Sequence, residues 1–319
     1  MTFDFEKNSG WINALATAML GAALYYAQTQ LIGLFAVILL FPYATLWVKE
    51  KPIWFLCSAL FSAVLSWTFM DATSAVNLFL LSLSGLVMGG LIKRKTPIWQ
   101  EVLLGAAALA LFSVGAFLTV QWVKGAGGNP FEQLRAEIEA LFSAVLETTT
   151  QSMPEEIARV ADSLAISQMV QRIVRLLPGL FIAGYLFLSF TNFSFSHFVL
   201  RKTGADVRPM PLSAFQLPRG MGYAALLGAL GAYLMTRLGG AWGSVGSNLN
   251  FVLLTLLFFN GLGAFDGISR KLLPGGLRIG LALVLLIGLR SWIAFVILGG
   301  LDVFWNFRNR PMPQFGGQR

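Results

Sequence analysis

Long apolar stretches separated by short polar loops dominate this sequence. Each stretch is close to the roughly 20 residues that a helix needs to cross a bilayer, because a helix rises about 1.5 Å per residue. Strands of a membrane barrel would be shorter and would alternate apolar and polar residues. We therefore predict membrane helices at Trp11–Ala27, Leu31–Val48, Ile53–Met70, Ser74–Ile92, Ile98–Val120, Ile173–Phe195, Met221–Arg237 and Asn248–Ile268.

The last apolar stretch, Leu272–Phe307, is long enough for more than one crossing. A single span would place Arg290 near the middle of the membrane, where an unpaired arginine costs at least ~2.5 kcal/mol. Two short helices, at Leu273–Leu289 and Ser291–Trp305, would place Arg290 at an outer turn instead. We favour this hairpin, which predicts an all-α polytopic membrane bundle of about ten membrane helices, within a range of about eight to ten.

Lysine and arginine gather in every second short loop, which predicts the orientation because such loops stay in the cytoplasm. The loops after the first, third and seventh spans carry almost no positive charge. Both termini are then cytoplasmic, and the protein is expected in a bacterial inner membrane. The topology residues are Lys93, Arg94, Lys95, Arg201, Lys202, Arg270, Lys271, Arg308 and Arg310.

The stretch between the fifth and sixth spans is acidic and differs from the rest of the chain. Helix-start patterns at Asn129-Pro130 and at Ser152–Glu155 precede apolar positions at helical spacing. We predict an amphipathic helical hairpin on the outer surface. The chain then divides into an N-terminal membrane block (1–123), the outer hairpin (124–172), a C-terminal membrane block (173–310) and a cytoplasmic tail (311–319).

Composition excludes several classes of protein. Apolar residues make up 56% of the chain and charged residues 12%, and the mean hydropathy is +0.70, far from the values of soluble domains. The net charge of +8 lies in short clusters rather than along one stripe, so no nucleic-acid partner is predicted. The single cysteine, Cys57, and the single histidine, His197, predict no disulfide and no metal site.

The sequence carries no recognised catalytic motif. The sequence contains no HExxH, no GxSxG and no P-loop, and the pair Gly261-x-Gly263 is not a dinucleotide fingerprint. No enzyme and no cofactor are therefore predicted.

Five polar residues inside or at the ends of apolar spans are the candidate ligand-binding positions: Asn192, Asn250, Asn260, Asp266 and Asp302. A polar group in hydrocarbon is costly, so each must have a partner or line a polar cavity. One interpretation is interhelical hydrogen bonding, with the two aspartates pairing with Arg270 or Arg308. The other is a ligand or ion site.

Two further patterns lead to predictions, one about a histidine and one about glycine pairs. His197 lies near the cytoplasmic end of the sixth span and is interpreted as an interfacial residue rather than a proton relay. The pairs Gly85-xxx-Gly89, Gly263-xxx-Gly267 and Gly276-xxx-Gly280 let helix backbones approach closely, and they predict packing within the chain before dimerisation.

Short motifs in the C-terminal half, over Leu177–Arg310, carry a family resemblance. They are Pro178, Asn192, Pro211-Leu212-Ser213-Ala214-Phe215, Leu217-Pro218, Asn250, Gly261-Leu262, Gly300-Leu301-Asp302, Asn306-Phe307-Arg308 and Arg310. This pattern resembles the YybS-like family of bacterial multi-pass membrane proteins, for which no activity is established. The resemblance implies an architecture similar to the substrate-binding subunits of energy-coupling-factor transporters, which bind vitamins or metal ions.

Two functions remain open from the sequence. One is a membrane solute-binding or transport component, with a small molecule bound in a closed, partly polar cavity among the C-terminal helices. The other is a non-transporting scaffold or assembly partner for envelope or signalling proteins, which would bind a protein at its cytoplasmic face. The lipid bilayer is the partner that both require.

Overall fold

The computed structural model describes residues 10–30, 34–123, 163–270 and 292–309, together with isolated positions 132, 136, 140 and 144 and several between 272 and 285. Every regular element in these ranges is a helix. The helices are α1 (Gly10–Gln30), α2 (Phe41–Lys49), α3 (Pro52–Phe69), α4 (Ala72–Lys93), α5 (Ile98–Val123), α8 (Ser163–Lys202), α9 (Arg219–Thr236), α10 (Gly240–Ser269) and α12 (Trp292–Trp305). Short 3-10 helices are η1 (Leu34–Val37), η2 (Leu212–Ala214) and η4 (Phe307–Asn309).

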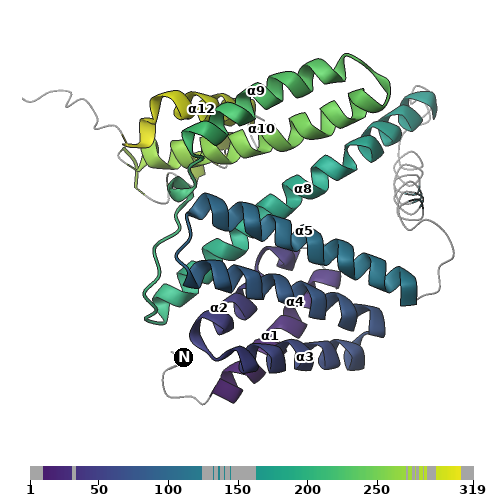
Figure 1. Cartoon of the computed structure of the whole chain (residues 1–319), viewed down its shortest axis with the longest axis vertical. Coiled ribbons are helices and arrows are strands. Elements are labelled where there is room, and N and C mark those ends of the chain that lie inside the picture. The colour runs from purple at the N-terminus through teal and green to yellow at the C-terminus, as the bar shows by residue number, and fades with distance from the viewer. Residues whose placement is uncertain are drawn as a thin grey trace, which may run out of the picture.

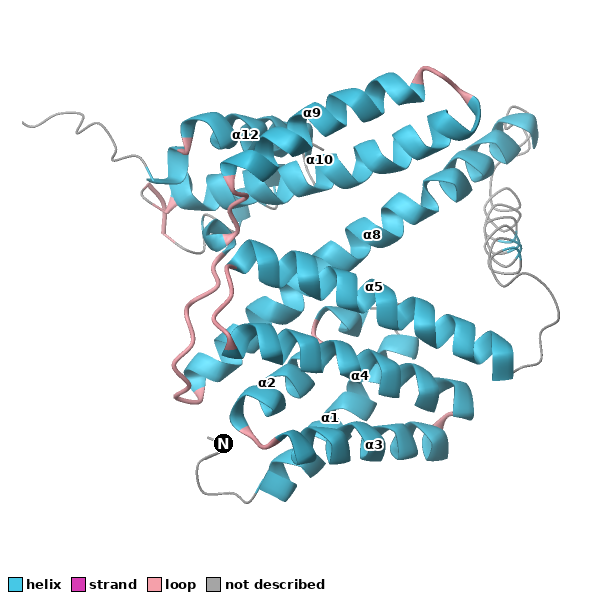
Figure 2. Ribbon diagram, viewed as in Figure 1, coloured by secondary structure: helices cyan, strands magenta, loops and turns pink. Residues whose placement is uncertain are grey.

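The helices form two groups with α8 between them (Figure 1). Helices α1 to α5 pack against one another, and α10 packs against α9 and α12. Helix α8 crosses between the groups and contacts α2 and α5 on one side and α10 on the other. The long loop between α8 and α9, residues 203–218, then runs along one end of the molecule (Figure 2).

Local sequence signals set where several helices begin. Pro52 lies in the first turn of α3, where its missing N–H costs no hydrogen bond. Asp71 caps α4, because its carboxylate accepts a hydrogen bond from the Ser74 N–H at 2.6 Å. Together these signals produce the antiparallel pair α3–α4, which a turn of a few residues joins.

Five of the described helices are long and apolar enough to cross a membrane: Pro52–Phe69, Ala72–Lys93, Ile98–Trp122, Gln171–Lys202 and Gly240–Ser269. Their outward faces carry large apolar side chains, such as Leu111 and Trp122, which are 68% and 83% exposed. A water-soluble surface would not carry so much exposed apolar area. The fold is therefore a helical bundle whose apolar outer surface suits contact with lipid.

The predicted second span, Leu31–Val48, is wrong as one continuous helix. Within it the structure has the short helix η1, a break over residues 38–40, and then α2, which is only nine residues long. Pro42 lies in the first turn of α2 and cannot donate the hydrogen bond that a continuous helix needs at this position. The Phe41-Pro42 pair was the available signal for this break.

The predicted sixth span is a helix, but its bounds differ from Ile173–Phe195. Helix α8 has 40 residues, and Pro178 lies inside it. Helix α12 coincides with the second half of the predicted last hairpin. Its first half, Leu273–Leu289, and the outer hairpin lie almost entirely outside the described residues, and so does the tail after residue 309.

Glycines allow two helices of the first group to touch closely. A Cβ on Gly85 would lie 2.6 Å from the Tyr43 Cβ, and a Cβ on Gly89 would lie 2.7 Å from the Ala44 carbonyl oxygen. Both distances are too short for any side chain, so α4 can pack against α2 only with glycine here. This is the packing within the chain that the Gly85-xxx-Gly89 pattern predicts.

Candidate functional site

The Asn192 side chain forms hydrogen bonds with the backbone at the break in the second span. Its side chain on α8 is fully buried, and its Oδ1 accepts a hydrogen bond from the Leu40 N–H at 2.8 Å. Its Nδ2 donates to the Ala36 carbonyl at 3.0 Å and to the Leu188 carbonyl at 2.8 Å. An N–H and a carbonyl four residues apart pair with each other in an uninterrupted helix. The Asn192 amide therefore bridges the two backbone groups that pair in a continuous helix.

Asn260 joins α10 to two other segments. Its Oδ1 accepts a hydrogen bond from the Leu217 N–H at 3.1 Å, and its Nδ2 donates to the Gly299 carbonyl at 2.8 Å. The side chain is 1% exposed. Asn260 thus binds the end of the 203–218 loop on one side and α12 on the other.

Arg308 is the centre of the polar contacts in the second group of helices. It is buried, and its guanidinium donates to the Asp302 carboxylate at 2.7 and 3.0 Å. The same guanidinium donates to the carbonyl oxygens of Ser213 and Phe215, at 3.0 and 2.6 Å, and to that of Asn260 at 2.8 Å. An arginine offers five N–H donors in a fixed fork, which suits several acceptors at once.

Asp266 contacts the same loop. Its Oδ2 accepts a hydrogen bond from the Ser213 N–H at 2.9 Å and pairs with Arg270 at 3.0 Å. Both ion pairs of the first interpretation, Asp266 with Arg270 and Asp302 with Arg308, are present. We call Asn260, Asp266, Asp302 and Arg308, with the loop backbone they hold, the loop clamp. The pair Gly263 and Gly267 faces this loop and Arg308, which lets the loop lie directly against α10.

The structure brings three of the five predicted site residues together in the loop clamp and leaves two apart. Asn192 lies at the break before α2. Asn250 is half-buried on α10, and its side chain makes no hydrogen bond to another described residue. Its neighbour Asn248 bridges the Gly179 N–H and the Arg175 carbonyl, beside Pro178 in α8.

The topology residues in the described ranges lie at one end of the bundle, where α4, α8 and α10 end. Lys95 pairs with Asp206 at 2.7 Å, so the loop before α5 and the 203–218 loop run side by side (Figure 2). Lys271 and Arg310 lie outside the described residues. His197 lies near the C-terminal end of α8 and is buried inside the protein, at 2% exposed.

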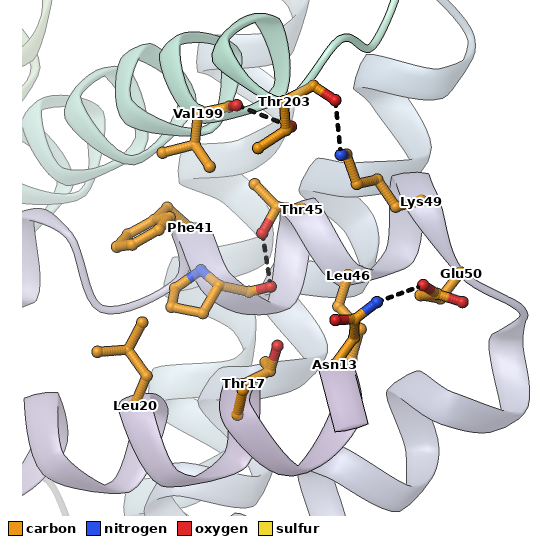
Figure 3. A pocket seen from close by; sticks show the side chains of 12 residues that line it. Asn13, Thr17, Leu20, Phe41, Thr45, Leu46, Lys49, Glu50, Val199 and Thr203 are labelled. Carbon is orange, nitrogen blue, oxygen red and sulfur yellow. Dashed lines mark hydrogen bonds between the residues drawn. The ribbon is translucent and has the colours of Figure 1, made fainter. Parts of the chain in front are cut away.

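A pocket of about 300 Å³ lies where the broken second span meets α1 and α8 (Figure 3). Side chains from α1, such as Thr17 and Leu20, face Phe41 and Thr45 from α2, and Val199 and Thr203 of α8 complete the wall. We call this cavity the α2 pocket. Its lining residues are Asn13, Ala16, Thr17, Leu20, Phe41, Pro42, Thr45, Leu46, Lys49, Glu50, Val199 and Thr203.

Two hydrogen bonds tie the elements around the α2 pocket at the end where the basic loops lie. The Asn13 Nδ2 donates to Glu50 at 2.7 Å and joins α1 to the end of α2. The Lys49 ammonium donates to the Thr203 carbonyl at 2.9 Å and joins α2 to the end of α8. The pocket thus has mostly apolar walls and a rim with both charge signs, which suits a small solute with an apolar body and a polar end.

None of the five predicted site residues lines the α2 pocket. The polar residues that line it, such as Asn13, Thr17, Lys49 and Glu50, lie near loops or alone in apolar runs, so no local pattern marks them as a site. The one available signal was Phe41-Pro42, because a proline inside a span predicts irregular backbone. Irregular backbone at membrane depth occurs where it is buried in protein or lines a cavity.

These features define an integral membrane protein built as a polytopic helical bundle. The chain belongs to a family of predicted membrane proteins, DUF2232, whose model matches residues 14–303. No curated protein and no solved structure matches the chain.

Proposed function

We propose that the protein is a solute-binding or transport component of a bacterial inner membrane, and that the α2 pocket holds its solute. The observation that carries this proposal is a cavity of about 300 Å³ at a broken membrane span. This volume is at the lower end of the range for pockets that bind small molecules, about 300–1,000 Å³. We assign the protein no catalytic step.

The break in the second span supports a binding role. Solute sites of many transporters lie beside discontinuous helices, because the interrupted backbone offers polar groups within the membrane. Here the Asn192 amide takes up two of those groups, and the helix continues as α2 along the pocket wall. From Asn13 to Leu20 the pocket runs about 10 Å along α1, at a rise of about 1.5 Å per residue. It therefore extends from the helix end into the depth of the membrane.

The position of the pocket suggests how a solute would enter. Glu50 and Lys49 lie at its rim, at the end of the bundle where lysine and arginine gather. By the distribution of positive charge, we place this end and the N-terminus in the cytoplasm. The Asn13–Glu50 and Lys49–Thr203 hydrogen bonds cross this rim, so both must open or stretch when a solute passes there.

The family resemblance of the C-terminal half adds to the proposal. We assign the chain to the YybS-like proteins and take its helical bundle as similar to the substrate-binding subunits of energy-coupling-factor transporters. Vitamin-sized solutes are therefore the first to test.

The test is thermal unfolding of the purified protein in mild detergent with a panel of water-soluble vitamins and other small amphipathic solutes. We expect one solute to raise the melting temperature of the wild type, because a ligand that binds only the folded state stabilises it. The Thr17→Phe variant fills the α2 pocket and should abolish this rise. The matched control is Thr29→Phe on the same helix, away from the pocket, which should keep it. A panel without any stabilising solute, or a Thr17→Phe variant that still responds, would contradict the proposal.

Orientation has a separate test. Reporter fusions after Lys93–Lys95 and after Glu132 should report opposite sides of the membrane, the first cytoplasmic and the second external. If both report the same side, the proposed topology is wrong, and the rim of the α2 pocket has no assigned compartment.

A second function, a non-transporting scaffold, is favoured by a different observation. The loop clamp uses Asn260, Asp266, Asp302 and Arg308 on the backbone of the 203–218 loop, which fixes a long loop at the cytoplasmic end. A fixed loop is a preformed surface for a protein partner. Co-purification of one protein in stoichiometric amount, lost when exposed loop residues are changed, would favour this function.

A further inference from the structure

A second set of buried charges lies at the N-terminal end of α5, and its residues neither line the α2 pocket nor belong to the loop clamp. Glu101 is fully buried in the first turn of α5, and His197 of α8 is 2% exposed. The His197 Nε2 lies 3.0 Å from a Glu101 carboxylate oxygen. The other oxygen of Glu101 accepts a hydrogen bond from the Arg208 guanidinium at 2.8 Å.

The second ring nitrogen of His197 determines where protons must be. Its Nδ1 lies 2.9 Å from the carbonyl oxygen of Arg208. A carbonyl oxygen only accepts hydrogen bonds, so Nδ1 must carry a proton. The contact between Nε2 and Glu101 then needs one more proton, because otherwise a bare nitrogen lone pair would face a carboxylate oxygen at 3.0 Å. The pair therefore holds one proton beyond those of a neutral histidine and an ionised glutamate.

The surroundings determine which partner carries this proton. The Arg208 guanidinium stabilises the ionised form of Glu101, and so does the positive end of α5, where Glu101 lies in the first turn. The proton consequently belongs to His197, whose two N–H groups then donate to Glu101 and to the Arg208 carbonyl. The other charged groups of these segments lie at the surface and are Lys93, Arg94, Lys95, Arg201, Lys202 and Asp206.

We propose that Glu101 and His197 form a proton-binding site that fastens the 203–218 loop to α5. Arg208 is held through both its guanidinium and its carbonyl, and its guanidinium also donates to the Thr96 carbonyl. Loss of the Nε2 proton leaves a lone pair against the Glu101 carboxylate. The buried arrangement then loses one charge-assisted hydrogen bond and gains a repulsion, so the loop around Arg208 separates from α5.

The chain allows a direct measurement, because His197 is its only histidine. After removal of any affinity tag, ¹⁵N-histidine labelling reports on this ring alone. With rising pH we expect Nε2 to lose its proton while Nδ1 keeps its proton throughout. The Glu101→Gln variant places an amide N–H opposite Nε2 and an amide oxygen opposite Arg208, so its ring should stay neutral with the proton on Nδ1. A ring that loses the Nδ1 proton first, or that titrates identically in Glu101→Gln, would overturn the proposal.

Hydrogen exchange tests the effect on the loop. The Ala205 and Val207 amides are hydrogen-bonded beside Arg208. After correction for the intrinsic pH dependence of exchange, their protection in the wild type should fall about tenfold or more over the pH range in which Nε2 deprotonates. In Glu101→Gln, the protection of these two amides should stay constant over this pH range.

Asp206→Asn is the matched control, because it removes only the exposed Lys95–Asp206 pair of the same loop. In this variant, the protection of the Ala205 and Val207 amides should fall over the same pH range as in the wild type. If Glu101→Gln does not fold, the wild type and Asp206→Asn still decide the matter. Unchanged protection while Nε2 deprotonates would overturn the proposal.

Discussion

The two halves of this membrane bundle differ in what their polar side chains face. In the loop clamp, Asn260, Asp302 and Arg308 are buried, and protein backbone occupies the space between them. Around the α2 pocket, the half-buried side chains of Thr17 and Thr45 are among the few polar groups that line a mostly apolar cavity of about 300 Å³. A polar residue inside a membrane span thus indicates a required partner, and only the structure reveals whether the partner is the protein or a space for a ligand.

Asn192 shows that a single polar residue can hold the backbone of an element far away in the sequence. It lies on α8, yet its amide holds the backbone of the broken second span, 152 positions away in sequence from Leu40. That backbone leads directly into α2, the wall of the pocket. A change at Asn192 should therefore affect the pocket without touching any residue that lines it.

The largest effect is expected from Arg308→Ala, which removes the centre of the loop clamp. Asp302 would remain as a buried unpaired carboxylate, and the carbonyls of Ser213 and Phe215 would lose their donor. Breaking a buried ion pair by removing one partner costs about 3–5 kcal/mol. Denaturant unfolding in detergent micelles measures this change. Arg270→Ala is the control: its pair with Asp266 is partly exposed, and it should cost only about 0–1 kcal/mol. Equal losses of unfolding free energy in the two variants would contradict the expectation that the buried ion pair of the loop clamp contributes more than the partly exposed Asp266–Arg270 pair.

The next effect is expected from Asn192→Leu. This change keeps the side-chain size but leaves the Leu40 N–H and the Ala36 carbonyl without their Asn192 partner, at a cost of about 2–4 kcal/mol. Asn250→Leu makes the same substitution at a half-buried site without a described partner and should stay within about 0.5 kcal/mol. Thermal unfolding of both variants compares them directly. If Asn250→Leu is the more damaging change, Asn250 has a partner or ligand that the described residues do not include.

The smallest effect is expected from Asp206→Asn, which removes an exposed ion pair outside both regions. The hydrogen bond from Lys95 lowers the pKa of the Asp206 carboxyl below its ordinary value of 3.8. Since the folded-state pKa is the lower one, any stability from this pair is present above pH 3.8 and is lost as the pH falls through the folded-state value. Melting curves at neutral pH should coincide for the wild type and the variant, because exposed pairs contribute little. A clear loss at neutral pH would show that the two loops depend on this contact.

Much of the architecture could be predicted from the sequence, because hydropathy is a local property. Helices α3, α4 and α5 follow the apolar runs within a few residues, and the basic loops mark one end of the bundle. The Asp266–Arg270 and Asp302–Arg308 pairs were also within reach, since each joins residues less than two helical turns apart. Asp266 and Arg270 are four apart and share one face of α10, whereas Asp302 and Arg308 meet because α12 ends at Trp305 and the chain turns into η4.

What the tertiary structure alone decided is the partner of each remaining buried polar group. Glu101 lies about a hundred positions before His197 and Arg208 in the chain, and no local pattern relates it to them. Asn260 meets Leu217 and Gly299 for the same reason: the contact exists only after α10, the loop and α12 have packed. The physical cause is that burial in lipid depends on each residue's own polarity, whereas a hydrogen bond needs two groups in one place, and only the completed fold brings them together.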